Sequence, residues 1–381
     1  MKIGIDARML GVGYGLGRYI EQLLLGLQEK DPTNQYVVFV RKINEGIIKK
    51  SNFRQVAADI PWYGWAEQIK FLKIINREKL DLLHFPHWNV PLFYKGKFVV
   101  TIHDLTMFHF PRLEATTLGP LKFFIKDKAH RIIIKSAVKK SRHIIAVSEF
   151  TKQDLRAALG VPADKMTVVY QAPHELDKRY EIRDEKAVLE KYKITKPYVL
   201  YVGAAYPHKN LKGLLRAWEI FKNKYSLDYQ LILAGKENYF YDRLLPGLAA
   251  QPAVSYIGFA ADEELELLYK NARLFVFPSL YEGFGLPPLE AGRQGVPVAA
   301  SSASSSPEIL GEGASYFSPE NYEQMAEVIF RCLTDEDLRH TLRQNMKAEL
   351  ARYSREKMVR ETLAVYNQFV EILLAELGKS V

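Results

Sequence analysis

Residues 278–290 read Pro278-Ser-Leu-Tyr-Glu-Gly-Phe-Gly-Leu-Pro-Pro-Leu-Glu290, with one carboxylate in a glycine loop and a second in the helix that follows. Two prolines suit the first turn of a helix, where their missing N–H groups would find no partner in any case. The glycines on either side of Phe284 let the backbone approach a ligand closely. Amides before the helix, at the positive end of its dipole, therefore suit an anion or sugar hydroxyl groups. These amides belong to Gly283, Phe284, Gly285 and Leu286.

Outward from this loop, short β-rich runs alternate with helical patterns. The expected strands are residues 2–6, 36–40, 82–85, 98–102, 143–147 and 166–169 in the first half, and 198–202, 230–234, 254–257, 274–278 and 297–300 in the second. Expected helices include 19–28, 152–159, 211–222, 262–270 and 289–294. Repeated βα units predict an α/β fold with parallel sheets and helices on both faces. Because 381 residues exceed what one hydrophobic core usually supports, two such domains are expected.

A charged segment with few β-branched residues separates the two series, and we interpret 176–196 as a linker. The first domain is then expected over 1–175 and the second over 197–355. Doubly wound sheets bind their ligands at the carboxyl ends of their strands. The main candidate residues all follow such strand ends.

The formal net charge of +9 is concentrated in the first half of the chain. Residues 1–175 carry 27 basic and 16 acidic side chains (+11), whereas residues 176–381 carry 26 and 28 (−2). The densest basic stretch, 122–142, is a helical pattern with Phe123, Phe124, Ile133, Ile134 and Val138 among its cations. It suits an anionic membrane face or a phosphorylated acceptor, and a solvated helix face is the equally weighted alternative. Nucleic acid is not expected as a partner, because the sequence contains no recognised binding module and no aromatic stacking pattern.

The cellular compartment is inferred from cysteine usage and hydropathy. Cys332 is the single cysteine, which excludes internal disulfides and a cysteine-based zinc cluster. The sequence opens on an expected strand without a charged leader, and no apolar run approaches the length of a bilayer span. A cytoplasmic protein is therefore expected.

A candidate phosphate-binding turn follows the first strand of the second half, in Gly203-Ala-Ala-Tyr-Pro-His-Lys-Asn210. Lys209, at the start of a helix, can neutralise a diphosphate leaving group, and the adjoining amides add to that effect. An ordinary surface lysine is the alternative interpretation.

The first βα turn, Gly11-Val-Gly-Tyr-Gly-Leu-Gly17, has the glycine content of a dinucleotide-binding turn. An NAD site also requires an acid at the end of the second strand, and here Arg41 and Lys42 follow Val40. The glycines alone are weak evidence, and a flexible loop is the alternative.

Histidines end two strands of the first half. His103 and Asp104 follow the expected strand 98–102, so His103 is expected to point into the ligand crevice, with a locally bonded loop histidine as the alternative. His84 and His87 end another strand, but no third ligand is spaced for a metal. We treat His84 and His87 as acceptor-cleft or structural residues.

An acidic cluster, Asp335-Glu-Asp337, has the D-x-D form that elsewhere holds a metal ion. Here Thr334 or Asp335 is expected to cap the helix 338–349, with Asp337 close to its dipole. Ser148 is similarly expected to cap a helix. Glu308 is either a helix-start acid or a functional residue. No metal is therefore expected.

Taken in order, these motifs resemble those of the retaining glycosyltransferases of family 4, the group 1 glycosyl transferases with a GT-B fold. The resemblance rests on a G-x-G-R-Y-like turn (15–19), H-D-L (103–105), V-S-E-F (147–150), P-H-K-N (207–210), the E-x7-E pair of Glu282 and Glu290, and P-E (307–308). Relatives often carry an arginine several residues before the lysine, where this chain has Ala204 and Ala205. Lys209 would then carry more of the positive charge.

The resemblance implies two doubly wound, Rossmann-like domains facing each other across a cleft. The last helical pattern, 355–377, would cross back so that 356–381 completes the first domain. Glu290 would hold the ribose hydroxyls, Glu282 the donor sugar or its developing positive charge, and Lys209 the diphosphate. Further residues implied at the site are Gly203 beside the diphosphate, Gly15 and Gly17 lining the cleft, His103 orienting the sugar, and His84, His87 and Asp104 on the acceptor side.

The implied activity is transfer of a hexose, with mannose slightly preferred, from a nucleoside-diphosphate sugar to a glycan or lipid-linked glycan in cell-surface polysaccharide synthesis. No metal or other cofactor is implied, and peripheral contact with an anionic inner membrane face would fit the basic helix. A covalent nucleophile stays an open question, while the resemblance favours front-side attack with a donor phosphate oxygen taking the acceptor proton. The alternatives are a GT-B sugar-nucleotide epimerase, a non-enzymatic basic binding protein and a catalytically silent scaffold.

Overall fold

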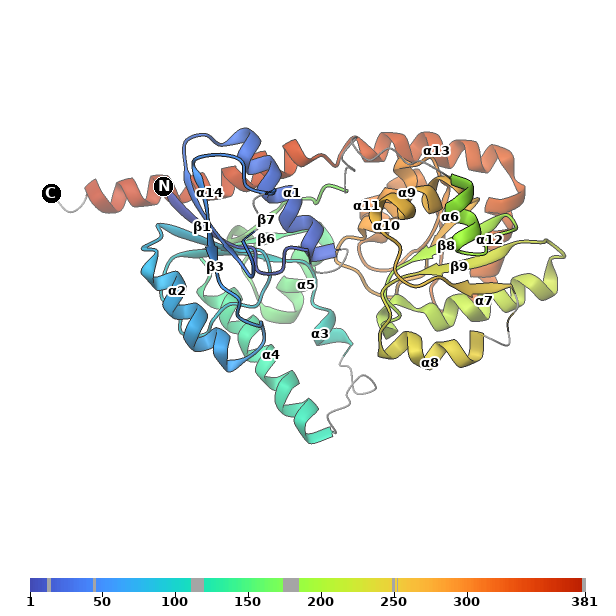
Figure 1. Ribbon diagram of the computed structural model, residues 1–381, viewed down its shortest axis with the longest axis horizontal. Helices are drawn as coiled ribbons and strands as arrows, with labels where there is room; N and C mark the ends of the chain where they lie inside the picture. The colour runs from blue at the N-terminus through green and yellow to red at the C-terminus, as the bar shows by residue number, and fades with distance from the viewer. Residues whose placement is uncertain are drawn as a thin grey trace. The chain divides into compact units, whose positions relative to one another are not determined.

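The computed structural model describes residues 1–11, 15–43, 46–110, 120–173, 185–248, 251 and 253–378, with side chains left undescribed at 120–123, 248 and 370–378 (Figure 1). Contacts between residues divide the chain into two compact units. Unit 1 holds residues 1–172 and 353–381, and unit 2 holds residues 173–352.

Unit 1 is built on a parallel sheet of seven described strands in the order β3-β2-β1-β4-β5-β6-β7. Its strands are β1 (Lys2–Asp6), β2 (Gln35–Val40), β3 (Phe53–Ala57), β4 (Leu82–Phe85), β5 (Phe98–Ile102), β6 (His143–Ala146) and β7 (Met166–Val168). The direction of strand addition reverses between β1 and β4. Ligands of doubly wound sheets bind at such a switch point.

Helices cover both faces of this sheet. They are α1 (Gly15–Lys30), the π-helix η1 (Glu67–Phe71), α2 (Leu72–Arg77), α3 (Thr106–His109), α4 (Pro120–Lys140), α5 (Glu149–Leu159) and α14 (Arg355–Gly378), with a 3-10 turn η3 (Ala163–Lys165). Alternate residues of β2 serve the two faces, as the pleat of a strand requires. Tyr36 and Val38 pack with α1 and α14, whereas Val37 and Phe39 pack with α2 and α4.

The C-terminal helix α14 packs beside α1 in unit 1, which confirms that part of the predicted fold (Figure 1). Gly26 of α1 permits the close approach, because a Cβ there would lie 2.4 Å from Val359 Cγ2. Ion pairs flank the contact, with Arg355 3.2 Å from Glu29 and Lys30 2.7 Å from Glu356.

Unit 2 repeats the same plan with a parallel sheet of six described strands in the order β10-β9-β8-β11-β12-β13. Its strands are β8 (Tyr198–Val202), β9 (Gln230–Ala234), β10 (Val254–Tyr256), β11 (Leu274–Phe277), β12 (Val298–Ser301) and β13 (Ala314–Phe317). Its helices and turns are α6 (Glu185–Lys191), η4 (Pro207–Lys209), α7 (Leu211–Lys224), α8 (Tyr239–Leu248), α9 (Asp262–Asn271), α10 (Leu286–Arg293), α11 (Ser306–Leu310), η5 (Gly311–Gly313), α12 (Tyr322–Thr334) and α13 (Glu336–Leu350). The switch point of this sheet lies between β8 and β11.

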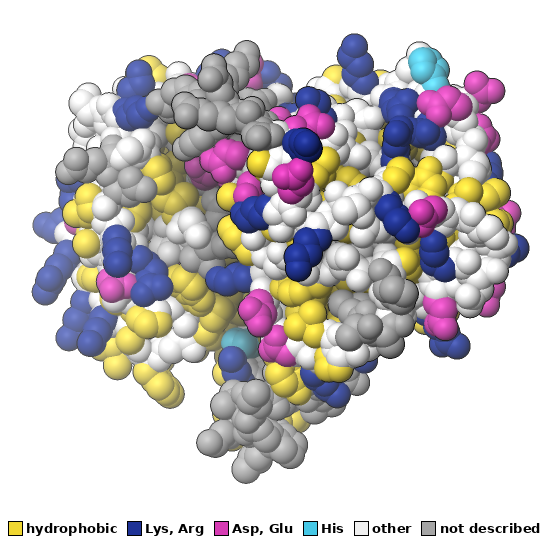
Figure 2. All heavy atoms as spheres, turned by 45° about the vertical axis from the view of Figure 1, so that its right-hand side comes forward, with side chains coloured by type: hydrophobic (Ala, Val, Ile, Leu, Met, Phe, Trp, Pro, Cys, Tyr) yellow, Lys and Arg dark blue, Asp and Glu magenta, His cyan; other side chains and the backbone are white. Residues whose placement is uncertain are grey.

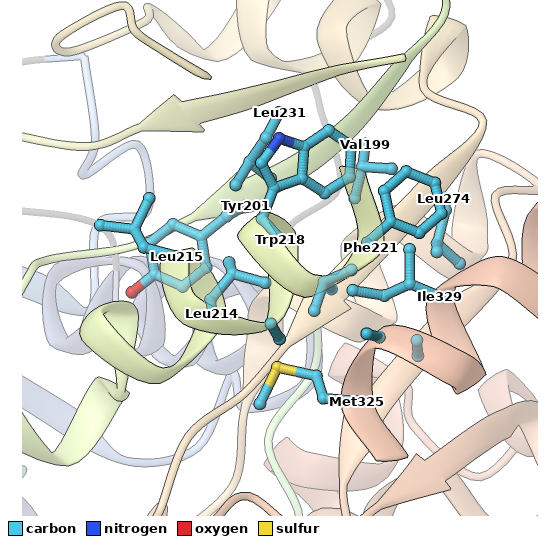
Figure 3. Packing of buried hydrophobic residues seen from close by; sticks show 14 of the residues in the cluster. Val199, Tyr201, Leu214, Leu215, Trp218, Phe221, Leu231, Leu274, Met325 and Ile329 are labelled. Atoms are coloured by element: carbon cyan, nitrogen blue, oxygen red, sulfur yellow. The ribbon is translucent and has the colours of Figure 1, made fainter. Parts of the chain in front are cut away.

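A core between α7, α12 and one face of the sheet holds these elements together (Figure 3). Trp218 and Phe221 of α7 stack at 4.8 Å between ring centroids and are fully buried. Met325 and Ile329 of α12 close the cluster. Burial of each such large side chain stabilises the fold by roughly 1.5–3 kcal/mol, so the strand ends at the switch point are fixed by a well-packed core.

Candidate functional site

The two motifs expected to bind phosphate follow neighbouring strands at the switch point of unit 2. The P-H-K-N turn follows β8, and the carboxylate loop follows β11, which pairs directly with β8. Asn210 fastens one motif to the other. It adopts a left-handed backbone (φ 55°), and its Nδ2 donates to the carbonyl oxygens of Pro278 (3.1 Å) and Pro319 (2.8 Å). The amide of Leu280 also donates to the carbonyl of His208 at 2.7 Å.

Lys209 and Glu282, both predicted from the sequence, form an ion pair. Lys209 Nζ lies 2.5 Å from Glu282 Oε1, and the hydroxyl of Ser279 donates to the same oxygen at 2.8 Å. The Lys209 side chain is 24% exposed and that of Glu282 10%. The pair is therefore half-buried, with its lysine reachable from solvent.

The glycine loop leads into α10 as its composition predicts. Gly285 precedes the helix with φ 95°, a left-handed conformation that favours glycine, and a Cβ there would lie 3.1 Å from the ring of Phe277. Pro287 and Pro288 lie in the first helical turn. The helix begins at Leu286, three residues before the expected start.

A serine loop after β12 supports the carboxylate loop, and the sequence analysis did not identify it. The amide of Glu282 donates to Ser304 Oγ (3.0 Å), and Ser304 itself adopts φ 55°. The hydroxyl of Ser305, fully buried, donates to the carbonyl oxygens of Glu282 (3.0 Å) and Phe284 (3.2 Å). The signal for this support is the run Ser304-Ser-Ser306 directly after a strand that neighbours β11.

Glu290 lies in the second turn of α10 and is 8% exposed. Its Oε2 accepts a hydrogen bond of 3.2 Å from the hydroxyl of Tyr269 on α9. Gly203, predicted beside the diphosphate, ends β8. Its carbonyl accepts from Tyr241 Oη at 2.8 Å, and a Cβ on Gly235 would approach that carbonyl to 2.0 Å. The carboxyl ends of β8 and β9 are thus packed too closely for a larger residue at Gly235.

In unit 1, His84 is a core residue, which favours the structural alternative over an acceptor-cleft position. It is fully buried, its Nδ1 lies 2.6 Å from Tyr366 Oη, and its Nε2 lies 2.8 Å from Thr101 Oγ1. Burial lowers the pKa of His84 to about 3. The neutral ring of His84, on β4, is bonded at both nitrogens to residues of β5 and α14. It therefore has a structural role in the core.

His103 ends β5 as predicted, and both of its ring nitrogens have partners. Nε2 lies 2.9 Å from the carbonyl of Pro86 and therefore donates, while Nδ1 accepts from Gln171 Nε2 at 2.7 Å. Burial lowers the pKa of His103. Asp104 accepts from the amide of Thr106 (2.9 Å) at the start of α3, so its carboxylate fixes a local turn.

His87 lies against aromatic rings, 4.6 Å from Trp88 and 6.2 Å from Tyr63 between centroids. Burial lowers its pKa to about 3. Its Nδ1 finds no hydrogen-bond partner within the described part of the chain. Of the histidines assigned to the acceptor side, His87 is thus the one with an unused ring nitrogen.

A buried ionic network fills the switch point of unit 1, and the sequence analysis missed it. Arg8 Nη2 lies 2.7 Å from Asp6 and 2.6 Å from Glu67, and Asn89 Nδ2 donates to both Glu67 oxygens (2.6 and 2.7 Å). Arg8 is 2% exposed and Glu67 0%, with the guanidinium 3.6 Å above the ring of Phe71. Burial opposes the charge of Arg8, but Asp6 and Glu67 raise its pKa overall. The sequence signal for this network is the run Asp6-Ala-Arg8 at the end of the first strand.

Comparisons with known proteins now define the family. Residues 182–349 match the model of the Glycosyl transferases group 1 family, and residues 14–172 match that of Glycosyltransferase Family 4. Over 292 residues the chain is 30% identical to O-antigen chain mannosyltransferase B of Escherichia coli, covering 75% of this chain and 74% of that protein. The chain belongs to the group 1 glycosyl transferases. It is a glycosyltransferase.

Solved structures confirm the GT-B class for this glycosyltransferase. Sucrose-phosphate synthase from Thermosynechococcus elongatus matches with a TM-score of 0.76 at 18% identity, covering 98% of this chain and 100% of that one. Anabaena HepE, in complex with UDP and glucose, matches with a TM-score of 0.70 at 17% identity, covering 96% and 99%. The two Rossmann-like sheets are the features that these folds share with this chain.

Two capping predictions of the sequence analysis are confirmed in the glycosyltransferase. Asp335 caps α13, accepting from the amide of Leu338 at 2.9 Å, and Ser148 caps α5, accepting from Thr151 at 3.0 Å. Glu308 lies in the first turn of α11. Among the described residues, no three His, Cys, Asp or Glu side chains are grouped as a metal site.

The glycine turn of the first half is only partly described, since 12–14 lie outside the described residues. Gly15 is the first residue of α1, and Gly17, in its first turn, is buried. The helix thus begins four residues before the expected start, and these two glycines belong to helix rather than to a loop.

The basic segment 122–142 of the glycosyltransferase forms most of α4, but its apolar residues do not share one face. Ile134 and Val138 are buried in the core of unit 1, and the side chain of Phe123 lies outside the described residues. Phe124, Ile125 and Ile132 are 64%, 61% and 50% exposed. Figure 2 shows Lys and Arg side chains interspersed with hydrophobic ones along an edge of the face it displays. In the part of the chain that is described, no helix has the length and apolar character needed to cross a bilayer.

Proposed function

We propose that this glycosyltransferase transfers a hexose, with mannose preferred, from a nucleoside-diphosphate sugar to a glycan or lipid-linked glycan in cell-surface polysaccharide synthesis. The observation that carries the proposal is the juxtaposition of Lys209, Glu282 and the amides of 283–286 at the switch point of unit 2. The name of the O-antigen mannosyltransferase relative supports mannose and a polysaccharide acceptor. The UDP and glucose bound to HepE support a sugar-nucleotide donor.

In the proposed mechanism, the bond between the anomeric carbon and the diphosphate oxygen breaks through an oxocarbenium-like state. Negative charge then builds on the diphosphate, where Lys209 and the loop amides stabilise it. Glu282 faces the sugar and its developing positive charge, and Glu290 holds the ribose hydroxyls. A lysine and aligned amides supply the positive charge, so no metal ion is required.

The proposed stereochemistry is retention, by front-side attack in which a donor phosphate oxygen takes the proton of the acceptor hydroxyl. His103 orients the donor sugar in this scheme. Both its ring nitrogens are held by Pro86 and Gln171, and burial lowers its pKa, so it suits an orienting role better than proton transfer. The family resemblance assigns Asp104 and His87 to the acceptor side.

A direct assay tests the proposal. The purified chain is supplied with GDP-, UDP-, ADP- or dTDP-hexoses and oligosaccharide acceptors, and the anomeric configuration of the product is read by NMR. We expect transfer with retention from one nucleotide class, unaffected by EDTA. An isomerised sugar nucleotide formed without acceptor would instead identify an epimerase. Loss of activity with EDTA would refute the metal-independent mechanism.

We further propose that unit 1 contacts the anionic face of a membrane through α4 and the loop before β5. A pocket of about 630 Å³ lies at the C-terminal end of α4 and is lined by residues 92–98 and 139–142. Its basic lining residues are Lys95, Lys97, Lys139, Lys140 and Arg142. None of the described lining residues is acidic, and Phe93, another of them, is 67% exposed. Cations beside exposed apolar side chains are the composition that anionic lipid surfaces attract.

Co-sedimentation with vesicles tests this contact. The variant replaces four lysines of α4 by glutamine, at Lys126, Lys128, Lys139 and Lys140. Each lysine near an anionic surface contributes about 1 kcal/mol, so we expect binding to phosphatidylserine vesicles to fall at least tenfold. The matched control replaces four exposed lysines of unit 2, at Lys212, Lys224, Lys236 and Lys347. Equal pelleting of wild type and the α4 variant would show that α4 is only a solvated face.

A further inference from the structure

Lys209 and Glu282, which the proposed function assigns to the diphosphate and to the sugar, are bonded to each other in the protein without ligand. The Nζ–Oε1 distance is 2.5 Å, and Ser279 donates to the same carboxylate oxygen at 2.8 Å. Lys209 therefore cannot give its full charge to a diphosphate while it keeps this partner. A diphosphate in the site would compete with Glu282 for the lysine ammonium.

The backbones that carry the two side chains are held by contacts that an exchange would leave intact. Leu280 donates to the carbonyl of His208, and the side chain of Asn210 donates to the carbonyl of Pro278. Ser304 accepts from the amide of Glu282, and Ser305 donates to its carbonyl. The ion pair can thus open by rotation of two side chains, without movement of either motif.

The donors available to the Glu282 carboxylate differ between the two nucleotides that the enzyme must bind, the nucleotide sugar and the nucleoside diphosphate. When a nucleotide sugar enters, Lys209 turns to the diphosphate, and sugar hydroxyls donate to Glu282 in place of the lysine. When the sugar has been transferred, the nucleoside diphosphate offers no such donor. Glu282 then remains a half-buried carboxylate beside an anion, with only Ser279 donating to it. A half-buried charge that loses its partner is unfavourable.

We propose that the Lys209–Glu282 pair makes this site discriminate against the sugar-free nucleoside diphosphate and so promotes release of that product. Re-formation of the ion pair displaces the diphosphate from Lys209 once the hydroxyl donors have left with the acceptor. Glu282 is in this sense a specificity residue as well as a contact of the sugar. The inference rests on the proposed donor site.

Calorimetric titration of Glu282→Gln tests the inference. The ligands are the nucleoside diphosphate that the wild type binds among GDP, UDP, ADP and dTDP, the corresponding nucleotide sugar, and inorganic pyrophosphate. Because glutamine has no charge to attract Lys209 or to repel an anion, we expect about tenfold tighter binding of the nucleoside diphosphate and of pyrophosphate. Binding of the nucleotide sugar should change by less than about threefold, since an amide still bonds to hydroxyls.

Two further variants separate the exchange from other effects. Glu336→Gln makes the same change in net charge on an exposed part of α13 and should change none of the affinities. Ser279→Ala removes the second donor to Glu282, so the exchange predicts the opposite sign, a weaker binding of the nucleoside diphosphate. It also supplies a test should Glu282→Gln fail to fold.

The outcomes distinguish this inference from the proposed function. If the wild type transfers sugar but Glu282→Gln binds the nucleoside diphosphate no more tightly, the exchange is overturned and the function stands. If the wild type binds none of these nucleotides, both are overturned.

Discussion

The two units place charged residues at the same point of the same fold, yet they use them differently. In unit 1 the switch point between β1 and β4 holds Arg8 and Glu67, exposed by 2% and 0%. In unit 2 the corresponding point between β8 and β11 holds Lys209 and Glu282, whose side chains are exposed by 24% and 10%. The first pair is closed off from solvent, and the second remains accessible to a ligand.

The difference lies in how many partners each charge has. Arg8 contacts two carboxylates and the face of Phe71, and Glu67 also accepts two hydrogen bonds from Asn89. Lys209, in contrast, pairs with a single carboxylate among the described residues, that of Glu282, through a flexible side chain. A ligand could replace one such contact, whereas entering the unit 1 network would require breaking several at once. The comparison suggests that the ionic groups of unit 1 stabilise the fold, whereas those of unit 2 exchange their contact with each other for contacts with a ligand.

Glu67→Ala tests the structural half of this comparison, and it has the largest expected effect. Removing one partner from a buried ion pair leaves an uncompensated charge and typically costs about 3–5 kcal/mol. We expect the free energy of unfolding, measured in urea, to fall by that amount. Asp59→Ala is the matched control, because its pair with Arg41 is exposed at both ends (58% and 44%), and it should cost at most about 1 kcal/mol. Equal effects of the two substitutions would contradict a stabilising network.

Lys209→Met tests the functional half. Methionine keeps the length of the side chain and removes its charge, so turnover should fall about 100-fold or more through loss of leaving-group stabilisation. The free energy of unfolding should change by only about 1 kcal/mol, because the pair is partly solvated. Steady-state kinetics and urea denaturation of the same preparation give both numbers. Normal turnover combined with strong destabilisation would show that Lys209 stabilises the fold and does not act on the substrate.

The sequence predicted the plan of both sheets, because buried parallel strands are continuous apolar runs that pattern alone can identify. It missed β3 and β13, both at or near sheet edges, where exposed residues such as Arg54 interrupt the apolar run. It also began α1 too late, because Gly15 and Gly17 were assigned to a turn. Helix boundaries depend on tertiary contacts that such patterns do not contain.

The positions of the candidate residues were predicted more closely in unit 2 than in unit 1. Motif spacing located Lys209 and Glu282 on neighbouring strand ends, but their contact and the support from Ser304 and Ser305 depend on which strands pair. In unit 1, the same rule left His84 either in an acceptor cleft or in a structural position. A histidine inside a strand can turn either way, and here Tyr366, 282 residues along the chain, bonds to it within the core.

The smallest expected effect concerns the pH dependence of the free energy of unfolding, and it comes from His84. Its pKa is about 3 in the folded protein, below its usual value, so between pH 6.5 and pH 3 the unfolded chain binds a proton that the folded one excludes. Stability is therefore fully present above pH 6.5 and is lost as the pH falls, by about 2 kcal/mol between pH 7 and pH 5 for one such histidine. His84→Gln should remove that much of the pH dependence of unfolding, whatever it costs at pH 7. His340→Gln, on the exposed side of α13, should leave the dependence unchanged. An unaltered pH profile in His84→Gln would mean that this ring is not sealed in the core.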